Sequence, residues 1–232
     1  EGDIEKALDL LRSNSALKAE KKASRVAADG ILRTSQGDNF ATLIEINSET
    51  DFAAKDSNFI EFTDEVHSYI SSKKVDDIAE FLDSDIEKKR QALIQTIGEN
   101  IQLRRLETVS IDSGMNAGVY LHSDSKLAAV VVISGGDESL AKDIAMHVAA
   151  FNPLCLSQDD IDPQVLEREK AIYVVQAEES GKPQEIMEKM IEGKLNRFLS
   201  EVSLLSQGFV KDSDTTIQKL LEANNAKIES FS

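Results

Sequence analysis

The chain has 232 residues, 41% of them hydrophobic, and 42 acidic residues against 26 basic ones give a formal net charge of −16. This length suffices for one large or two modest domains. Because Trp is absent and aromatic residues make up 5%, we expect a core of Ile, Leu, Val and Ala. The acidic balance argues against sequence-independent nucleic-acid binding, which depends on Lys and Arg at phosphates, and against an anionic membrane surface. It allows an interface with a basic or neutral protein.

Cysteine content and hydropathy narrow the class of protein further. Cys155 is the single cysteine, so an internal disulfide framework is excluded, and Cys/His zinc spacing is absent. We interpret Cys155 as a small buried hydrophobe. No apolar run reaches the roughly 18 residues of a membrane span, and no secretory signal pattern is visible. We therefore expect a protein of the reducing cytoplasm.

The amino-terminal segment has the pattern of a helix. Apolar residues at helical spacing over residues 3–12 are Ile4, Ala7, Leu8 and Leu11. A Lys-rich linker is predicted over 18–25. The sequence has no initiator Met, opens within this helical pattern and ends at Phe231-Ser232 as though a strand were beginning. We expect a piece of a longer protein with trimmed ends.

A strand hairpin and helices are predicted next. Strands over 31–34 and 40–47 flank a Gly/Asn turn at 36–39. One helical face follows, formed by Phe59, Phe62, Val66, Tyr69 and Ile70. Ser84 and Glu87 form a predicted capping box for a second helix, which carries Ile86, Leu93, Ile94 and Ile97. Gly98 is predicted to end that helix, and a third strand covers 101–109.

The second half repeats this order and then becomes helical. Strands are predicted over 118–122 and 127–134, joined by a polar turn at 123–126. The next helix has an apolar stripe of Leu140, Ile144 and Val148, and it ends at Asn152-Pro153. Between 162 and 205, Pro163 opens a helix, Gly181 breaks it, and Pro183 opens another at its first position. Such a short connection predicts an antiparallel helical hairpin. The tail over 209–228 should return to the second half.

The predicted fold class is α+β, with two small subdomains of antiparallel sheet plus helix and a protruding helical hairpin. The predicted boundaries are 1–25 for the remnant of an amino-terminal helical module and its linker, and 26–112 for the first core subdomain. The second core subdomain covers 113–155 and 205–232, and the hairpin covers 156–204.

A polar corner after the second strand is the main candidate site. Asp51-Phe52 follows the strand end and precedes a helix start at Asp56. Loops on a rigid scaffold often carry function, and an exposed Phe beside a carboxylate suits a wedge pushed into a partner. The alternative is a core Phe next to a helix-capping Asp, since Phe is usually buried. The pattern alone leaves both interpretations open.

Motifs for catalysis and metal binding are missing from the sequence. It contains no Walker loop and no G-x-G-x-x-G. Three histidines lie far apart: His67, predicted at the surface; His147, predicted to be a satisfied packing residue; and His122, at a hairpin tip. Acid pairs such as Asp76-Asp77 are interpreted as solvated loops or helix starts. A hydrolase or metal enzyme is disfavoured because no nucleophile is paired with a base.

Several segments together resemble the elongation factor Ts family. The segment over 45–55 matches Glu-Ile/Val-Asn-x-Gln/Glu-Thr-Asp-Phe-Val-Ala/Ser-Lys except that Ala53 replaces the usual Val. Further resemblances occur in the family's order, at 21–30, at 97–105, at 144–150 and at 180–183. The resemblance covers essentially the whole chain. The family usually has Tyr-Gln-His at the end of a strand in the second half. This chain has Tyr120-Leu121-His122 there, so Leu121 replaces the usual Gln.

The resemblance implies a translation elongation factor that exchanges guanine nucleotide on elongation factor Tu, without cofactor, metal or covalent chemistry. It implies a wedge that dislocates Mg²⁺ at Thr50, Asp51, Phe52 and Ala53. Distant anchors are implied at Ile97, Gly98 and His122. Direct contacts with nucleic acid or membrane are not expected, and the hairpin offers a surface for a homodimer. The alternative is a non-catalytic acidic adaptor that bridges proteins.

Overall fold

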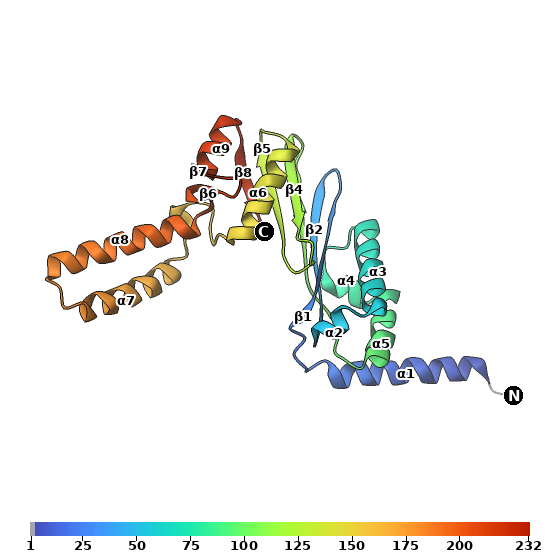
Figure 1. Ribbon diagram of the computed structural model, residues 1–232. Coiled ribbons are helices and arrows are strands. Elements are labelled where there is room, and N and C mark those ends of the chain that lie inside the picture. Colours follow the sequence, from blue (N-terminus) through green and yellow to red (C-terminus); the bar gives the residue numbers. More distant parts are fainter. Residues whose placement is uncertain (1–2) are drawn as a thin grey trace. The chain divides into compact units, whose positions relative to one another are not determined.

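The computed structural model describes residues 3–232, which form two compact units (Figure 1). One unit holds the chain up to Ser113 together with Val119–Val130, and the other holds Gly114–Gly118 with Val131–Ser232. Glu1 and Gly2, within the predicted 1–25 segment, lie outside the described residues. The prediction of an α+β fold is confirmed, since helices accompany small antiparallel sheets. The predicted boundaries at 25, 112, 155 and 204 stay predictions.

The first helix, α1, is longer than predicted and covers Ile4–Lys22. The prediction of a linker from Lys18 is wrong, because 18–22 consists of good helix formers and is supported by packing. Ala19 is buried in the core of the first unit, and Ser15 Oγ donates to Gln95 Oε1 at 2.6 Å. The predicted stripe does not face this core in its described members, since Ile4 and Leu11 are exposed. The side chains of Ala7 and Leu8 lie outside the described residues.

Sheet β1-β2-β3 of the first unit comprises β1 (Asp29–Gln36), β2 (Phe40–Ser48) and β3 (Gln102–Ser110), all antiparallel. The three predicted strands are confirmed within one to two residues at each end. Gly30, at φ 139°, is required at the start of β1. A Cβ there would lie 2.1 Å from the carbonyl oxygen of Ile46 on β2, so the two strands can approach only without a side chain.

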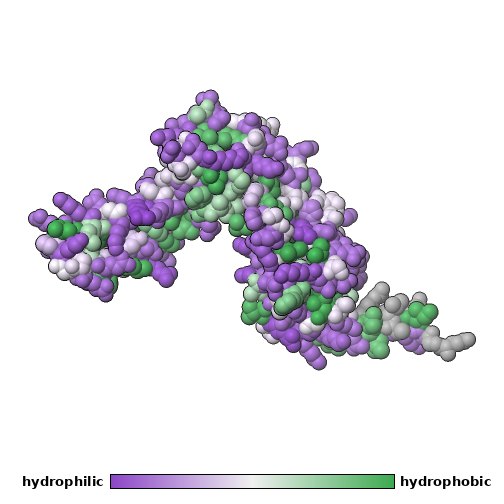
Figure 2. Space-filling model, viewed as in Figure 1, coloured by the Kyte–Doolittle hydropathy of each residue, from purple (hydrophilic) through white to green (hydrophobic). Residues whose placement is uncertain are grey.

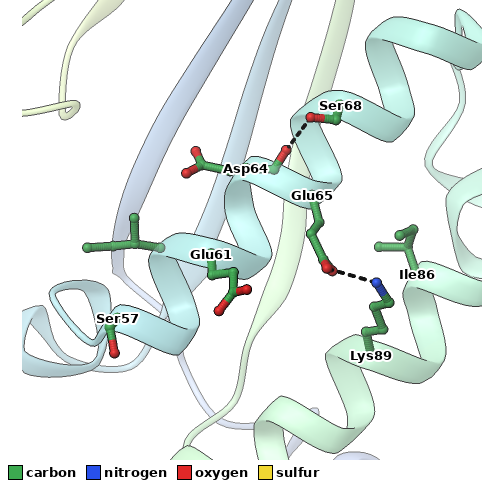
Figure 3. A pocket seen from close by; sticks show the side chains of 8 residues that line it. Ser57, Glu61, Asp64, Glu65, Ser68, Ile86 and Lys89 are labelled. Carbon is green, nitrogen blue, oxygen red and sulfur yellow. Dashed lines mark hydrogen bonds and ion pairs between the residues drawn. The ribbon is translucent and has the colours of Figure 1, made fainter.

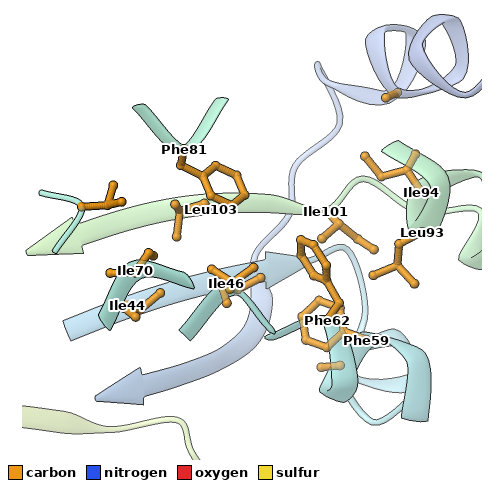
Figure 4. Close-up of a cluster of buried hydrophobic side chains, with 14 residues drawn as sticks. Ile44, Ile46, Phe59, Phe62, Ile70, Phe81, Leu93, Ile94, Ile101 and Leu103 are labelled. Carbon is orange, nitrogen blue, oxygen red and sulfur yellow. The ribbon is translucent and has the colours of Figure 1, made fainter. Parts of the chain in front are cut away.

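Four helices accompany this sheet: α2 (Asp51–Ala54), α3 (Ser57–Lys73), α4 (Ile78–Leu82) and α5 (Asp85–Ile97). The predicted face of α3 is buried except for the partly buried Tyr69. Figure 4 shows the resulting core, in which Phe59 and Phe62 of α3 lie with Ile46 of β2 and Ile94 of α5. Helix α4 was not predicted from the sequence; this short helix brings Phe81 into the same core.

The predicted capping box of α5 is wrong, although Ser84 is the residue before its first turn. The Ser84 hydroxyl donates backward to the carbonyl of Phe81 at 2.5 Å. The Glu87 carboxylate instead accepts two bonds of 2.6 Å from Arg90, which also donates to the carbonyl of Ile101. A partly buried Arg offers a carboxylate a better partner than one backbone N–H. Gly98 ends α5 at φ 87°, as predicted.

Sheet β4-β5-β8 comprises β4 (Met115–Leu121), β5 (Ala128–Ser134) and β8 (Lys227–Phe231). The predicted strands are confirmed, with β4 beginning three residues early, and β8 shows that the tail returns to β5. Helix α6 (Glu138–Phe151) begins after Asp137 and ends at Asn152 in the left-handed conformation, as predicted. Gly118 allows α6 to approach β4, because a Cβ there would lie 2.1 Å from backbone atoms of α6.

The predicted helical hairpin is confirmed as α7 (Pro163–Glu179) and α8 (Gln184–Val202), which run side by side in opposite directions (Figure 1). Pro183 lies one residue before the first helical position, a small correction. Lys194 of α8 reaches α7, where its ammonium group donates to Gln176 and lies 5.5 Å from the centroid of the Tyr173 ring. Ala177 alone is buried among the residues of these two helices. Figure 2 shows mainly polar surface on this arm.

After the hairpin the chain passes through η2 (Leu204–Ser206), β6 (Gly208–Phe209), β7 (Asp212–Thr216) and α9 (Ile217–Ala223). A second short 3-10 turn, η1 (Gln158–Asp160), precedes the hairpin. The burial predicted for Cys155 is confirmed; its Sγ lies 3.4 Å from the hydroxyl of Ser203. His147 is fully buried and satisfied, as predicted. Its Nε2 is 3.0 Å from Gln207 Oε1, and its Nδ1 accepts from the N–H of Val210 at 3.1 Å.

Candidate partner-binding site

Phe52, the aromatic residue of the motif at 45–55, is highly exposed. Its exposed fraction is 81%, whereas Ala53 and Ala54 beside it are buried at 5% and 4%. Successive residues of a helix turn by about 100°, so the one-turn helix α2 directs its two alanines inward and Phe52 outward. The interpretation of Phe52 as a core residue is therefore wrong. The ring is presented to solvent on a backbone whose other side is anchored in the core.

Thr50, not Asp51, caps α2. The Thr50 hydroxyl accepts from the N–H of Ala53 at 3.3 Å, and the extended backbone of Thr50 (φ −127°) is typical of a cap. The Thr50 carbonyl accepts from the Ser48 hydroxyl at 3.0 Å. Asp51 thus lies inside the first turn, and the interpretation of Asp51 as a capping residue is also wrong. The alternative to a wedge, a core Phe next to a helix-capping Asp, is therefore excluded for both residues.

The Asp51 carboxylate pairs with Lys55, with 2.7 Å between Oδ2 and Nζ. This hydrogen bond raises the pKa of the Lys55 ammonium group. Both side chains are substantially exposed, so solvent competes with the pair and an approaching partner can exchange it at little cost. Asp51 is therefore available to another cation or hydrogen-bond donor directly beside the exposed ring.

The Ile97–Gly98 corner lies next to this loop, and two glutamates join them. The Glu99 carboxylate accepts from the Thr50 N–H at 2.9 Å and from the Thr50 hydroxyl at 2.7 Å. In return, the Glu49 carboxylate accepts from the N–H of Asn100 at 2.6 Å. Gly98 itself is exposed, while Ile97 packs partly against the core. Glu49 and Glu99 were not predicted as site residues, although both lie in the segments at 45–55 and 97–105 that resemble the family.

His122 lies at the tip of the β4–β5 hairpin, exposed as predicted. Its N–H donates to the carbonyl of Leu127 at 2.8 Å, and its ring Nδ1 lies 2.9 Å from Asp124 Oδ1. This hydrogen bond from His122 lowers the pKa of Asp124. The tip is fixed on β1, because the N–H of Leu32 donates to the carbonyl of Ser125 at 2.7 Å. His122 is thus held in place by bonds on both sides of the turn.

The turn that follows His122 also shares a cavity with α2. This cavity has a volume of about 370 Å³ and is lined by residues of both segments, among them Asp51, Ala54, Lys55, Asp124 and Lys126. Lys126 Nζ donates to the carbonyl of Gly30 at 2.6 Å and pairs with Asp29. The structure therefore brings the wedge candidates close to the hairpin tip as well as to the Ile97–Gly98 corner.

The open groove between α3 and α5 has none of the features of a reaction centre. It has a volume of about 640 Å³, and Figure 3 shows Glu65 of α3 pointing toward Lys89 of α5. Two of the carboxylates that line it are occupied, Asp64 by Arg33 at 2.9 Å and Glu65 by Lys89 at 2.8 Å. Among the side chains that the structure describes, no group of three or more His, Cys, Asp or Glu could hold a metal ion.

Two other residues keep their predicted character. His67 is partly exposed on α3, and its Nε2 lies 3.0 Å from the carbonyl of Thr34. Asp77 precedes α4 and accepts from the N–H of Ala79 at 2.8 Å. Of the two interpretations of this acidic pair, solvated loop or helix start, the helix start is therefore confirmed for Asp77.

None of the described helices is long and apolar enough to cross a membrane.

Comparisons with known proteins place this fold and loop among the translation elongation factors. Residues 49–232 match the family described as "Elongation factor TS". An elongation factor Ts from Hahella chejuensis is 47% identical over 230 residues, which cover 98% of this chain and 79% of that protein. Those from Alcanivorax borkumensis and Francisella tularensis subsp. novicida are 45% and 46% identical, over 100% and 99% of this chain and 83% and 80% of theirs.

The chain therefore belongs to the elongation factor Ts family and is a translation elongation factor. The match to the family begins at Glu49, so it includes part of the first unit, with the wedge loop, and the whole of the second unit. The resemblance noted in the sequence is confirmed.

Proposed function

We propose that this chain is a guanine-nucleotide exchange factor for elongation factor Tu. It binds the GDP-bound form, disturbs the Mg²⁺ site and promotes release of GDP so that GTP can bind, in the cytoplasm and without covalent chemistry. The observation that carries the proposal is the 81% exposure of Phe52 beside Asp51, on a turn whose neighbours are buried. An exposed, rigidly supported aromatic ring next to an exchangeable carboxylate is suited to insertion into a partner protein.

The energetics of exchange set what such a wedge must do. Each tenfold loss of nucleotide affinity requires about 1.4 kcal/mol of opposing interaction. Burying a Phe side chain contributes about 1.5–3 kcal/mol, which corresponds to a weakening of about ten- to a hundredfold if the ring is buried only in the nucleotide-poor state. Only such differential binding shifts an equilibrium between two states. The coupling is reciprocal, so GDP or GTP at high concentration must in turn expel the factor.

Asp51 supplies the electrostatic part of the proposal. Its pair with Lys55 is exposed and exchangeable, so the carboxylate can turn toward groups that hold the waters around Mg²⁺. Because Mg²⁺ requires nearly ideal octahedral geometry, a small displacement of its surroundings weakens both metal and nucleotide binding. Thr50 and Ala53 contribute by fixing the shape of α2, through the cap and through burial.

Ile97, Gly98 and His122 are proposed as anchors on a part of elongation factor Tu away from its nucleotide. Once these residues are bound, insertion of Phe52 becomes an intramolecular event with a raised effective concentration. Structural support exists for the link between anchors and wedge: the corner is bonded directly to the wedge loop, and the turn after His122 shares a cavity with it.

A stopped-flow measurement of labelled GDP leaving elongation factor Tu tests the proposal. The wild-type chain should accelerate release, whereas an acidic adaptor would bind without accelerating it. Phe52→Ala should lower the maximal rate about tenfold or more and leave the melting curve unchanged. Leu82→Ala, which truncates another exposed apolar residue of the same unit, serves as the matched control. Binding without acceleration by the wild-type chain would favour the adaptor, and unfolding of Phe52→Ala would exclude the wedge.

A further inference from the structure

The bonds of Glu49 and Glu99 form a reciprocal cross-link between two segments that are distant in sequence. Glu49 precedes Thr50 yet bonds to Asn100, and Glu99 follows Gly98 yet bonds to Thr50. The bonded residues are 51 and 49 positions apart. We call these two residues the glutamate clasp. Each half of the clasp is a carboxylate that accepts a backbone N–H, which is a charge-assisted and geometrically specific bond.

The Glu99 half of the clasp fixes the cap of α2. The Thr50 hydroxyl donates to Glu99 at 2.7 Å and accepts from the N–H of Ala53 at 3.3 Å, so one rotamer of Thr50 serves both bonds. A helix of four residues is too short to be stable from its own hydrogen bonds. The direction in which α2 presents Phe52 therefore depends on this outside support.

The Glu49 half fixes the corner after α5. Its partner, Asn100, is 1% exposed, and the Asn100 side-chain amide donates to the carbonyl of Arg25 at 2.9 Å. The Arg25 guanidinium group lies 3.5 Å from the Glu49 carboxylate. Asn47 at the end of β2 donates in the same way to the carbonyl of Ala27 at 3.0 Å. The corner, the wedge loop and the segment after α1 are thus bonded into one framework.

We propose that Glu49 and Glu99 are positioning residues that hold the Asp51–Phe52 wedge and the Ile97–Gly98 corner as a single rigid binding surface. This inference rests on the proposed exchange function and adds two residues to it. Neither carboxylate needs to touch the partner. A wedge ordered before binding does not lose conformational entropy on insertion, so more of its burial energy opposes nucleotide binding.

Glu99→Gln tests the clasp with little change in shape. A Gln side chain can accept from the Thr50 N–H through its oxygen and donate to the Thr50 hydroxyl through its NH₂ group, because a hydroxyl is both donor and acceptor. The substitution therefore keeps the shape but replaces two charge-assisted hydrogen bonds with two weaker neutral ones. We expect the maximal rate of GDP release from elongation factor Tu to fall about tenfold. The concentration of factor that gives half-maximal release should change little, because the anchors stay in place. Glu80→Gln, at an exposed position of α4, is the matched control.

A double-mutant cycle separates positioning from general stability. If Glu99 acts through Phe52, then Glu99→Gln should have no further effect on the maximal rate in the Phe52→Ala protein. Amide hydrogen exchange of the wild-type chain adds a readout independent of activity, since the N–H groups of Thr50 and Asn100 should be protected.

Three results would overturn the inference alone: a wild-type rate in Glu99→Gln, an undiminished further loss in the Phe52→Ala background, or rapid exchange of both amides in the wild-type chain. A wild-type chain that does not accelerate GDP release would overturn the proposed function, and the inference with it.

Discussion

The wedge loop of the first unit and the α7–α8 arm of the second both expose apolar side chains, but on very different support. Phe52 projects from a turn flanked by buried alanines, a cap and the glutamate clasp. Ile172, Val175 and Ile186 project from two helices in which Ala177 alone is buried. Exposure by itself is common among apolar residues. An exposed ring becomes a candidate for function where several independent contacts hold its backbone in one conformation.

Removing the Asp51 carboxylate from the wedge loop should change exchange more than any change in the arm. Asp51→Ala should lower GDP release about tenfold at saturating Mg²⁺ and much less when Mg²⁺ is chelated, because the proposed target of Asp51 is the surroundings of the metal. Stopped-flow release under both conditions measures the difference. Lys55→Met breaks the same ion pair but keeps the carboxylate, so it should retain exchange. Equal loss with and without Mg²⁺ would make Asp51 an ordinary interface residue.

Deleting the arm should affect exchange less than changing the wedge. Residues 162–199 can be replaced by a short Gly/Ser bridge, because Gln158 and Ser200 are within 3.4 Å through their side chains. The two chain segments at the base of the arm would keep the hydrogen bonds between them. One of these is donated by the N–H of Leu204 to the carbonyl of Cys155 at 2.9 Å. We expect a folded protein whose exchange rate falls only about threefold, because the arm is a pair of antiparallel helices joined by a short loop and the proposed wedge and anchor residues all lie outside it.

Circular dichroism and GDP release on the shortened protein measure these outcomes. Loss of cooperative unfolding would show that the arm is part of the core of its unit. A folded protein without any exchange activity would show that the arm contains a contact that exchange requires.

His122→Ala should weaken binding without slowing the exchange step. Truncation of an interface residue acts mainly on dissociation, so the complex with elongation factor Tu should dissociate about two- to threefold faster. At saturating factor, the maximal rate of GDP release should be nearly normal. Asp124→Asn, which keeps a side chain of the same size beside His122, is the control for the shape of the turn. An unchanged affinity with a lower maximal rate would place His122 in the exchange step instead.

The smallest effect concerns pH and the base of the arm. Burial lowers the pKa of His147 from 6.5, against a smaller opposite effect of its hydrogen bond to Gln207. Above pH 6.5 both folded and unfolded chains hold a neutral imidazole, and stability from this group is complete. Below pH 6.5 the unfolded chain takes up a proton that the folded chain resists, so the free energy of unfolding should fall as the pH falls.

Denaturant unfolding at pH 7.5 and 5.5 measures this contribution. His147→Gln should lose that part of the pH dependence, whereas His122→Ala, which removes an exposed histidine, should retain it. An identical slope in His147→Gln and the wild-type chain would show that other groups cause the pH dependence.

Much of the fold follows from local pattern. Period-two strands around a Gly/Asn turn predict β1 and β2, and an apolar face repeating every three to four residues predicts α3 and α6. Pro163 and Gly181 mark the ends of α7 within two residues. These signals are local because backbone conformation and one-sided burial depend on neighbours in sequence. The missed helix α4 and the lengthened α1 instead depend on buried Phe81 and Ala19, that is, on contacts with distant elements.

From the residues alone one can predict that Asp51-Phe52 follows the end of a strand in an acidic α+β protein. The outward direction of the Phe52 ring depends on the folded core, because burial of Ala53 and Ala54 fixes the rotation of α2. The tertiary structure likewise decided that Thr50 is the cap and that Glu99 supports it from 49 positions away. A hydrogen bond between such distant residues exists only when the chain has folded around its core, and no spacing in the sequence encodes it.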